Sequence, residues 1–220
     1  MVSPLTPAQA ARVYDHIGRF QDWQAFYEGA AVNDLIAHVH LGAAGRVFEL
    51  GCGTGALAAR LLAERLPLEA TYLGVDVSTH MVRLSRERLY RWAGRARVRQ
   101  TDGSLPLAGA DGAYSHVLAV YVFDLLPEEY ARAVLCEAAR LLEPGGRMGL
   151  VSLTPGRAWV ARLVSGAWGA LWELSPMLTG GCRPVDLRYL LEQGWVTEYR
   201  ALVEAWGVAS EVIVATPTRS

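Results

Sequence analysis

The chain has 220 residues, of which 52% are hydrophobic and 20% are charged, and its formal net charge is −1. This length and composition predict one globular domain with a sizeable core. The near-neutral charge excludes a global field that would draw the protein onto nucleic acid or an acidic membrane.

Three cysteines, Cys52, Cys136 and Cys182, are widely spaced and form no pattern typical of a disulfide framework or a zinc site. The histidines share no metal-ligand spacing either, so no metal is expected. The N-terminus lacks a signal-peptide pattern, and the most apolar long window, 158–174, is interrupted by charges and is too short to span a bilayer. We therefore expect a cytoplasmic protein without stable membrane insertion. Surface association with a membrane and the oligomeric state stay open.

Helical apolar spacing runs through residues 5–40, and after them short apolar runs alternate with amphipathic segments. Ser78 or Thr79 suits the N-cap of the second amphipathic segment, and the run Pro144-Gly145-Gly146 is expected to end the third. The predicted strands are 46–50, 71–77, 95–100, 115–122 and 147–153, and the predicted helices are 56–66, 79–92 and 128–142.

The alternation of strands and helices predicts right-handed βαβ units and a parallel sheet covered on both faces. Two strand-like runs, 195–206 and 208–215, flank Gly207 and predict a terminal β-hairpin with an antiparallel last strand. The expected fold is a Rossmann-like, doubly wound α/β domain with a mostly parallel sheet. Its expected parts are an N-terminal helical lid (1–42), a cofactor-binding core (43–153), a helical insert over the substrate site (154–183), and a helix with the terminal hairpin (184–220).

A glycine-rich turn follows the first predicted strand. Gly51, Gly53 and Gly55 permit positive φ angles and let the backbone approach a ligand closely. Asp76 follows Gly55 by 21 residues, at the end of the second strand, where a carboxylate can accept hydrogen bonds from ribose hydroxyls. Asp102 ends the third strand on the same rim, in a position suited to an adenine amino group.

This spacing alone does not decide the cofactor. Gly51, Gly53 and Ala56 also satisfy the G-x-G-x-x-G/A pattern of dinucleotide enzymes, which leaves NAD possible. Glu49, two residues before the first glycine, would face a pyrophosphate unfavourably but would attract an ammonium group. S-adenosylmethionine carries a sulfonium and an ammonium and no phosphate. The acidic rim and the terminal hairpin therefore favour S-adenosylmethionine over NAD.

Four ordered motifs span roughly residues 46–153: V-F-E-L-G-C-G-T-G, G-V-D-V-S, T-D-G and L-L-E-P-G-G-R. They resemble the motifs of class I S-adenosylmethionine-dependent methyltransferases, nearest to the ubiquinone/menaquinone or phospholipid small-molecule enzymes. The resemblance implies a methionine and ribose side, an adenine side, a floor beneath the cofactor and a residue that closes over its amino-acid end. By this resemblance, the methionine and ribose side consists of Glu49, Gly51, Gly53 and Gly55, with Asp76 on the ribose. The adenine side consists of Val77, Asp102 and Gly103. Val120 would form the floor, and Tyr14 would close over the amino-acid end.

The acceptor side is less well defined. Tyr121 and Asp124, just past the fourth strand, are positioned to face the transferred methyl group and are candidates for orienting the acceptor. A tryptophan-rich segment after the fifth strand predicts either core packing or a lid that lines an apolar acceptor site. The candidate lining residues are Trp159, Trp168 and Trp172, together with Tyr27 and Phe26.

The sequence thus predicts an enzyme that transfers a methyl group from S-adenosylmethionine to a small or medium-sized, largely apolar acceptor. A tetrapeptide resembling Asn-Pro-Pro-Tyr, typical of DNA amino-methylating enzymes, does not occur, so no nucleic-acid substrate is expected. Two alternatives remain: an NAD-dependent oxidoreductase, and a non-catalytic module that binds S-adenosylmethionine.

Overall fold

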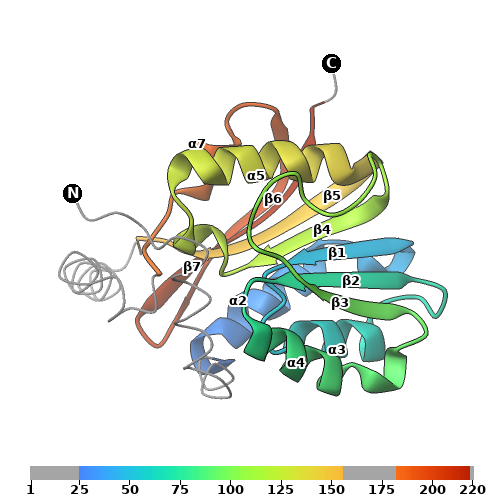
Figure 1. The fold of residues 1–220 in the computed structure, drawn as a ribbon. Helices are drawn as coiled ribbons and strands as arrows, with labels where there is room; N and C mark the ends of the chain where they lie inside the picture. The colour runs from blue at the N-terminus through green and yellow to red at the C-terminus, as the bar shows by residue number, and fades with distance from the viewer. Residues whose placement is uncertain (1–24, 156–181, 219–220) are drawn as a thin grey trace.

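A computed structural model describes residues 25–155 and 182–218, and the side chains from residue 28 onward within the first range. In these ranges a seven-stranded sheet with the order β3-β2-β1-β4-β5-β7-β6 forms the centre of the molecule (Figure 1). Neighbouring strands are parallel from β3 to β5, and β7 is antiparallel to both β5 and β6. The predicted mostly parallel sheet with a C-terminal hairpin is confirmed. The strands are β1 (Arg46–Leu50), β2 (Thr71–Asp76), β3 (Ala96–Gln100), β4 (Tyr114–Val120), β5 (Leu142–Leu153), β6 (Trp195–Ala205) and β7 (Val208–Pro217).

Helices cover both faces of the sheet. Figure 1 shows α5 and α7 on one face and α2, α3 and α4 on the other, as expected of a doubly wound fold. Short 3₁₀ turns η2 (Leu41–Ala43), η3 (Tyr90–Trp92) and η4 (Phe123–Leu125) connect them to the strands. The helices are α2 (Ala25–His38), α3 (Ala56–Glu64), α4 (Thr79–Arg88), α5 (Glu128–Leu141) and α7 (Leu187–Leu191).

Two apolar clusters form the core, one on each face of the sheet. Val47 of β1 is buried in the cluster that includes Leu35 of α2 and Leu61 of α3. The next residue, Phe48, is buried in the opposite cluster with Leu135 of α5. Successive side chains of a strand point to opposite faces, so a short apolar run such as β1 supplies both clusters.

Several predicted boundaries differ from the structure, among them the end of α4 and the start of β5. Ser78 is the N-cap of α4, and its Oγ accepts a hydrogen bond of 3.1 Å from the Met81 N–H. However, α4 ends at Arg88, and a 3₁₀ turn takes the place of the last predicted helical residues. Pro144-Gly145-Gly146 ends no element, because β5 already begins at Leu142.

The glycines of that tripeptide lie in an irregularity of β5. Leu142 pairs with Tyr114 before the register shifts, and Gly145 has a φ of 78°. A Cβ on Gly146 would lie 3.0 Å from the carbonyl oxygens of both Glu143 and Ser115. Proline and glycine are tolerated in a strand at such a bulge, which explains why a sequence typical of a helix stop continues as a strand.

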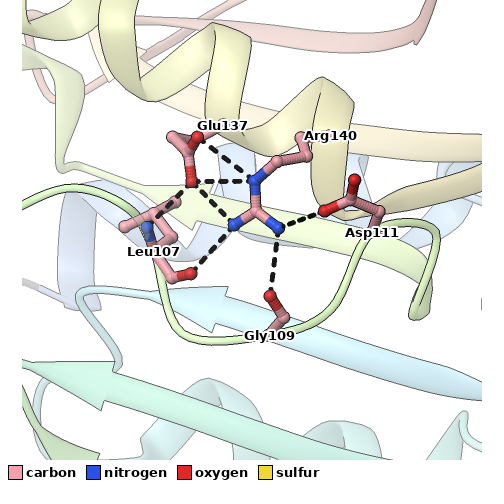
Figure 2. Close-up of polar contacts among 5 residues, drawn as sticks. All are labelled: Leu107, Gly109, Asp111, Glu137 and Arg140. Atoms are coloured by element: carbon pink, nitrogen blue, oxygen red, sulfur yellow. Dashed lines mark hydrogen bonds and ion pairs between the residues drawn. The ribbon is translucent and has the colours of Figure 1, made fainter.

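The long connection between β3 and β4 is fixed to α5 by one guanidinium group (Figure 2). Arg140 of α5 donates to Asp111 Oδ1 at 2.7 Å and to the carbonyls of Leu107 and Gly109 at 3.0 Å each. Glu137, one turn earlier, pairs with Arg140 at 2.7 Å and accepts a hydrogen bond of 2.9 Å from the Leu107 N–H. This network holds the C-terminal half of the connection against the helix.

Helix α2 lies against the hairpin strands and β5. The Tyr199 hydroxyl of β6 is 2.9 Å from each carboxylate oxygen of Asp34, and the His38 ring stacks on Tyr199 with 3.7 Å between centroids. The N-terminal and C-terminal parts of the described chain are therefore in direct contact. The division of the domain into a lid, core, insert and hairpin stays a prediction, since 1–24 and 156–181 lie outside the described residues.

Candidate functional site

The carboxyl ends of β1 and β4 lie side by side where the winding of the sheet reverses. β1 pairs with β2 on one side and with β4 on the other, and the chain visits β2 and β3 before it returns to β4. Ligands of open α/β sheets bind outside the carboxyl ends of the strands at this switch point. The structure brings every predicted cofactor residue that it describes to this end of β1, β2, β3 or β4.

The glycine turn follows β1 directly. Gly51, Gly53 and Gly55 have φ angles of 66°, 51° and 75°, a region that favours glycine. A Cβ on Gly51 would lie 2.5 Å from Cγ2 of Val122, and one on Gly55 would lie 3.1 Å from the backbone Cα of Ser85. The turn is therefore confined between the end of β4 and helix α4, and no larger residue fits at either position.

Asp76 ties this turn to the start of α4. Its side chain is buried at the end of β2. One carboxylate oxygen accepts a hydrogen bond of 2.9 Å from the Gly53 N–H, and the other accepts one of 2.9 Å from the Ser78 N–H. Both contacts fix the orientation of the carboxylate beside the glycine turn.

Glu49 is a second buried acid behind the glycine turn, with 3% of its surface exposed. The Tyr72 hydroxyl donates a hydrogen bond of 2.7 Å to its Oε2. Burial, assisted by the nearby Asp76 carboxylate, raises the pKa of Glu49 to about 8, although the bond from Tyr72 opposes the shift. A cation beside a buried acid favours the charged form of that acid, so a positive group close to Glu49 would lower its pKa and stabilise its carboxylate.

Tyr72 was missed by sequence reasoning, although a signal for it exists. Gly74 of β2 lies opposite Glu49 in the parallel register. A Cβ on Gly74 would lie 2.6 Å from the Tyr72 hydroxyl and 2.9 Å from Cβ of Cys52. The glycine leaves room for the Tyr72 hydroxyl to reach the acid, and a small residue opposite a buried carboxylate indicates such a partner.

Asp102 and Gly103 form an exposed turn shortly after β3. Asp102 Oδ1 accepts hydrogen bonds from the N–H and Oγ–H of Ser104, at 2.9 and 2.6 Å, and these bonds lower the pKa of Asp102. Gly103 has a φ of 79°. Its carbonyl accepts a hydrogen bond from the hydroxyl of Tyr130 in α5, a residue that the sequence did not indicate.

Two apolar residues complete the predicted cofactor side. Val77 follows Asp76 and is half-buried, and its carbonyl accepts a hydrogen bond of 3.3 Å from Gln100. Val120 is the last residue of β4 and is half-buried against the core cluster on the α2 face. Both lie at the expected end of the sheet.

Tyr121 follows β4 directly and has a strained conformation. Its φ is 54°, which is uncommon for a bulky residue and explains why the strand stops before the predicted Val122. The Tyr121 N–H donates to the Val151 carbonyl at 2.7 Å, and its hydroxyl lies 2.8 Å from Oγ of Ser210 in β7. Burial raises the pKa of the Tyr121 phenol, so the phenol is neutral at ordinary pH.

Asp124 lies in η4 and is completely buried. Its Oδ1 accepts a hydrogen bond of 3.1 Å from Ser152 Oγ in β5. In the part of the chain that the structure describes, Oδ2 has no hydrogen-bond partner. Burial raises the pKa of Asp124 to about 6, while the bond from Ser152 opposes the shift. A buried carboxyl group that titrates near neutral pH is suited to accept a proton or a hydrogen bond.

Several predicted residues fall outside what the structure describes. They are Tyr14, the side chains of Phe26 and Tyr27, and Trp159, Trp168 and Trp172. Among the described residues no group of three His, Cys, Asp or Glu side chains could hold a metal ion. No helix within the described ranges is long and apolar enough to cross a membrane.

Comparison with known proteins decides the family. The family described as "Methyltransferase domain" matches residues 47–146. Trans-aconitate 2-methyltransferase of Azoarcus sp. (strain BH72) is 30% identical over 209 residues, which cover 86% of this chain and 74% of that protein. The chain belongs to the class I S-adenosylmethionine-dependent methyltransferase family. This membership sets aside the NAD-dependent oxidoreductase that the glycine pattern left open.

Other curated relatives match shorter parts of this chain. Demethylmenaquinone methyltransferase of Tropheryma whipplei (strain Twist) is 34% identical over 115 residues, 52% of this chain and 44% of that protein. The biotin biosynthesis bifunctional protein BioCD of Bordetella avium (strain 197N) is 35% identical over 147 residues, 66% of this chain and 28% of that protein. The chain thus spans less than half the length of either relative.

Solved structures share the fold at low identity. A geranyl diphosphate methyltransferase in complex with geranyl diphosphate and sinefungin has a TM-score of 0.72 and 14% identity, over 96% of this chain and 99% of that chain. The cyclase SpnF has a TM-score of 0.70 and 17% identity, over 99% of both chains. A protein named as a cyclase therefore shares this fold. Because one fold can carry different activities, function has to be argued from the site.

Proposed function

We propose that this protein transfers the methyl group of S-adenosylmethionine to a small-molecule acceptor. The observation that carries the proposal is the pair of buried acids, Glu49 and Asp76, behind a glycine turn at the switch point of the sheet. S-adenosylmethionine combines an ammonium and a sulfonium with a ribose, and two carboxyl groups suit these partners. A pyrophosphate at the same turn would meet the acids unfavourably.

Each cofactor residue then has a physical role. Glu49 attracts the ammonium group, and Tyr72 holds its carboxyl group in place. Asp76 accepts hydrogen bonds from the ribose hydroxyls, while the Gly51–Gly55 backbone lies close to the methionine and ribose. The adenine side is formed by Val77, Asp102 and Gly103, Val120 lies beneath the cofactor, and Tyr14 closes over the amino-acid end.

When bound, S-adenosylmethionine supplies an activated methyl group on a good leaving group. The task of the protein is then to align the acceptor atom with the methyl carbon and the sulfur, which can account for much of the acceleration. Tyr121 orients the acceptor from the end of β4, with its hydroxyl held by Ser210. Asp124 accepts a hydrogen bond, or a proton where the acceptor has to lose one, through Oδ2.

The acceptor that we propose is small to medium-sized and largely apolar. Its support is the tryptophan-rich segment of the sequence, with Tyr27, Trp159, Trp168 and Trp172 as lining residues, and the near-neutral net charge. Relatives named for trans-aconitate and demethylmenaquinone also act on small molecules by their names. We propose no nucleic-acid partner and a cytoplasmic location.

Two measurements test the proposal. Isothermal titration calorimetry is expected to show binding of S-adenosylhomocysteine and none of NAD, and Asp76→Ala is expected to abolish the binding. Incubation with S-adenosylmethionine and a panel of small acceptors is then expected to release S-adenosylhomocysteine. Binding of NAD alone would refute the cofactor assignment. Binding without release, across acceptors carrying oxygen, nitrogen and carbon nucleophiles, would favour the non-catalytic module instead.

A further inference from the structure

Helix α5 holds the connection between β3 and β4 at two separate places. Near its N-terminus, Tyr130 donates a hydrogen bond to the Gly103 carbonyl. Near its C-terminus, Arg140 and Glu137 bind the stretch from Leu107 to Asp111 (Figure 2). The Tyr130 contact holds the turn next to the predicted cofactor side, whereas the second contact holds a later stretch of the connection.

The Tyr130 contact acts on the tip of a turn whose other contacts lie within the turn or at its start. Asp102 and Ser104 bond to each other, and the Gly103 N–H donates to Oγ1 of Thr101 at 3.2 Å. The Thr101 N–H donates at 3.0 Å to the carbonyl of the last residue of β2, which fixes the start of the turn. The Tyr130 hydroxyl links Gly103, two residues further on, to a helix that packs on the core.

Burial, together with the nearby Asp102 carboxylate, raises the pKa of Tyr130. The bonds from Ser104 both engage Oδ1 of Asp102. An exposed acceptor oxygen on an anchored turn can receive an N–H donor from a ligand. The direction of that oxygen depends on where the turn is held.

We propose that Tyr130 is a positioning residue, which orients the Asp102–Ser104 turn so that Asp102 accepts the exocyclic amino group of adenine. The inference rests on the proposed function, since it needs an adenosyl ligand at this rim. Tyr130 itself does not touch the ligand. Its hydroxyl sets the place of the turn, and the turn discriminates adenine from a base that lacks the amino donor.

The test compares two ligands on two proteins. S-adenosylhomocysteine carries the adenine amino group, and S-inosylhomocysteine carries a carbonyl oxygen in its place. The wild-type protein is expected to bind the first about tenfold more tightly, the size of one hydrogen bond to a charged group. In Tyr130→Phe, which removes only the hydroxyl, this preference is expected to fall about threefold or more. The ratio of two dissociation constants does not depend on the fraction of folded protein.

Two control variants separate positioning from a general structural effect. Tyr90→Phe removes a hydroxyl from a side chain that is 81% exposed, and it should change neither constant. Arg140→Leu removes the second contact of α5, and it should lower the melting temperature while keeping the preference for adenine. A preference that falls equally in Arg140→Leu would mean that any loosening of the connection suffices, and it would overturn the specific role of Tyr130.

Other outcomes also decide the matter. Unchanged preference in Tyr130→Phe would overturn the positioning role and leave the proposed function intact. Failure of the wild-type protein to bind S-adenosylhomocysteine would refute the proposed function, and the role of Tyr130 would be refuted with it. In turnover assays with a methylated acceptor, Tyr130→Phe should raise KM for S-adenosylmethionine and leave kcat unchanged, as expected for a residue that acts on binding alone.

Discussion

The hydroxyl of Tyr72 lies 2.7 Å from Oε2 of Glu49, and this bond joins the buried acid of β1 to the neighbouring strand β2. The bond keeps an acid in place at a position where burial disfavours its charge. The ligand-free protein therefore carries a destabilising feature that a cationic ligand would relieve, a common relation between binding sites and stability.

Replacing Glu49 by Gln should separate these two effects. The folded pKa of Glu49 is raised from 4.5 to about 8, so its contribution to stability is full below pH 4.5 and is lost as the pH rises through 8. Glu49→Gln keeps the acceptor for Tyr72 and should stabilise the ligand-free protein by roughly 1–3 kcal/mol at pH 8. Urea unfolding measures this, and calorimetry should show weaker binding of S-adenosylhomocysteine. A variant that is less stable at pH 8 would contradict the prediction.

His116 should show the opposite pH dependence. This buried side chain lies 3.0 Å through Nε2 from the Val39 carbonyl, and burial lowers its pKa from 6.5 to about 4. Because the unfolded chain takes up the proton first, the stabilising contribution is present above pH 6.5 and is lost as the pH falls toward 4. The loss by pH 5 should reach about 2 kcal/mol. Relative to the wild type, the unfolding free energy at pH 7.5 minus that at pH 5 should therefore become smaller in His116→Gln and larger in Glu49→Gln.

Gly51→Ala should destabilise the fold and abolish cofactor binding. The new Cβ would lie 2.5 Å from Cγ2 of Val122 at a φ of 66°, so it meets both a clash and backbone strain. We expect a loss of about 2–4 kcal/mol in urea unfolding. Adding Val122→Ala should restore only the part due to the clash.

Gly94→Ala serves as the matched control, because nothing lies within 4 Å of its added Cβ and its φ is not in the left-handed region. It should change stability by less than about 1 kcal/mol. Equal losses in Gly51→Ala and Gly94→Ala would show that the glycine turn is not confined.

Asp124→Asn should reduce kcat about 100-fold or more if Asp124 accepts a proton from the acceptor, while binding of S-adenosylhomocysteine stays unchanged. The rate should rise with pH through about 6, the pKa of the buried carboxyl group. Ser152→Ala removes a hydrogen bond that favours the charged form, so the same limb of the pH profile should move to higher pH. A pH profile that stays in place in Ser152→Ala would separate Asp124 from the chemical step.

Much of the fold could be predicted, because the strand and helix periods are clear in the sequence. The alternation along β1 and the hairpin around Gly207 follow from local spacing. The bulge at Gly145 could not be predicted, since it depends on the pairing of Leu142 with a strand nearly thirty residues away. A helix stop and a strand bulge use the same residue types.

In the site, too, residues placed by local spacing could be predicted, and contacts between distant segments could not. Glu49 and Asp76 could be placed from their spacing to the glycines, and the structure brings them to the same end of the sheet. Tyr72 and Tyr130 were missed, because their partners are set by strand register and by the crossing of α5 over a loop. Asp124 was expected near the acceptor, but its hydrogen bond from Ser152 could not be predicted, because it depends on the packing of η4 against β5.

The position of β7 has a consequence for how the molecule assembles. β7 is synthesised after every other strand of the sheet, yet it lies between β5 and β6. It also carries Ser210, which hydrogen-bonds to the Tyr121 hydroxyl. A nascent chain on the ribosome can thus form the β1–β4 half early, while β5 keeps an open edge until the final hairpin emerges. Pairing across such distances slows folding, and an open edge can pair with other chains. The contact between Tyr121 and Ser210 is therefore among the last in the sheet to form.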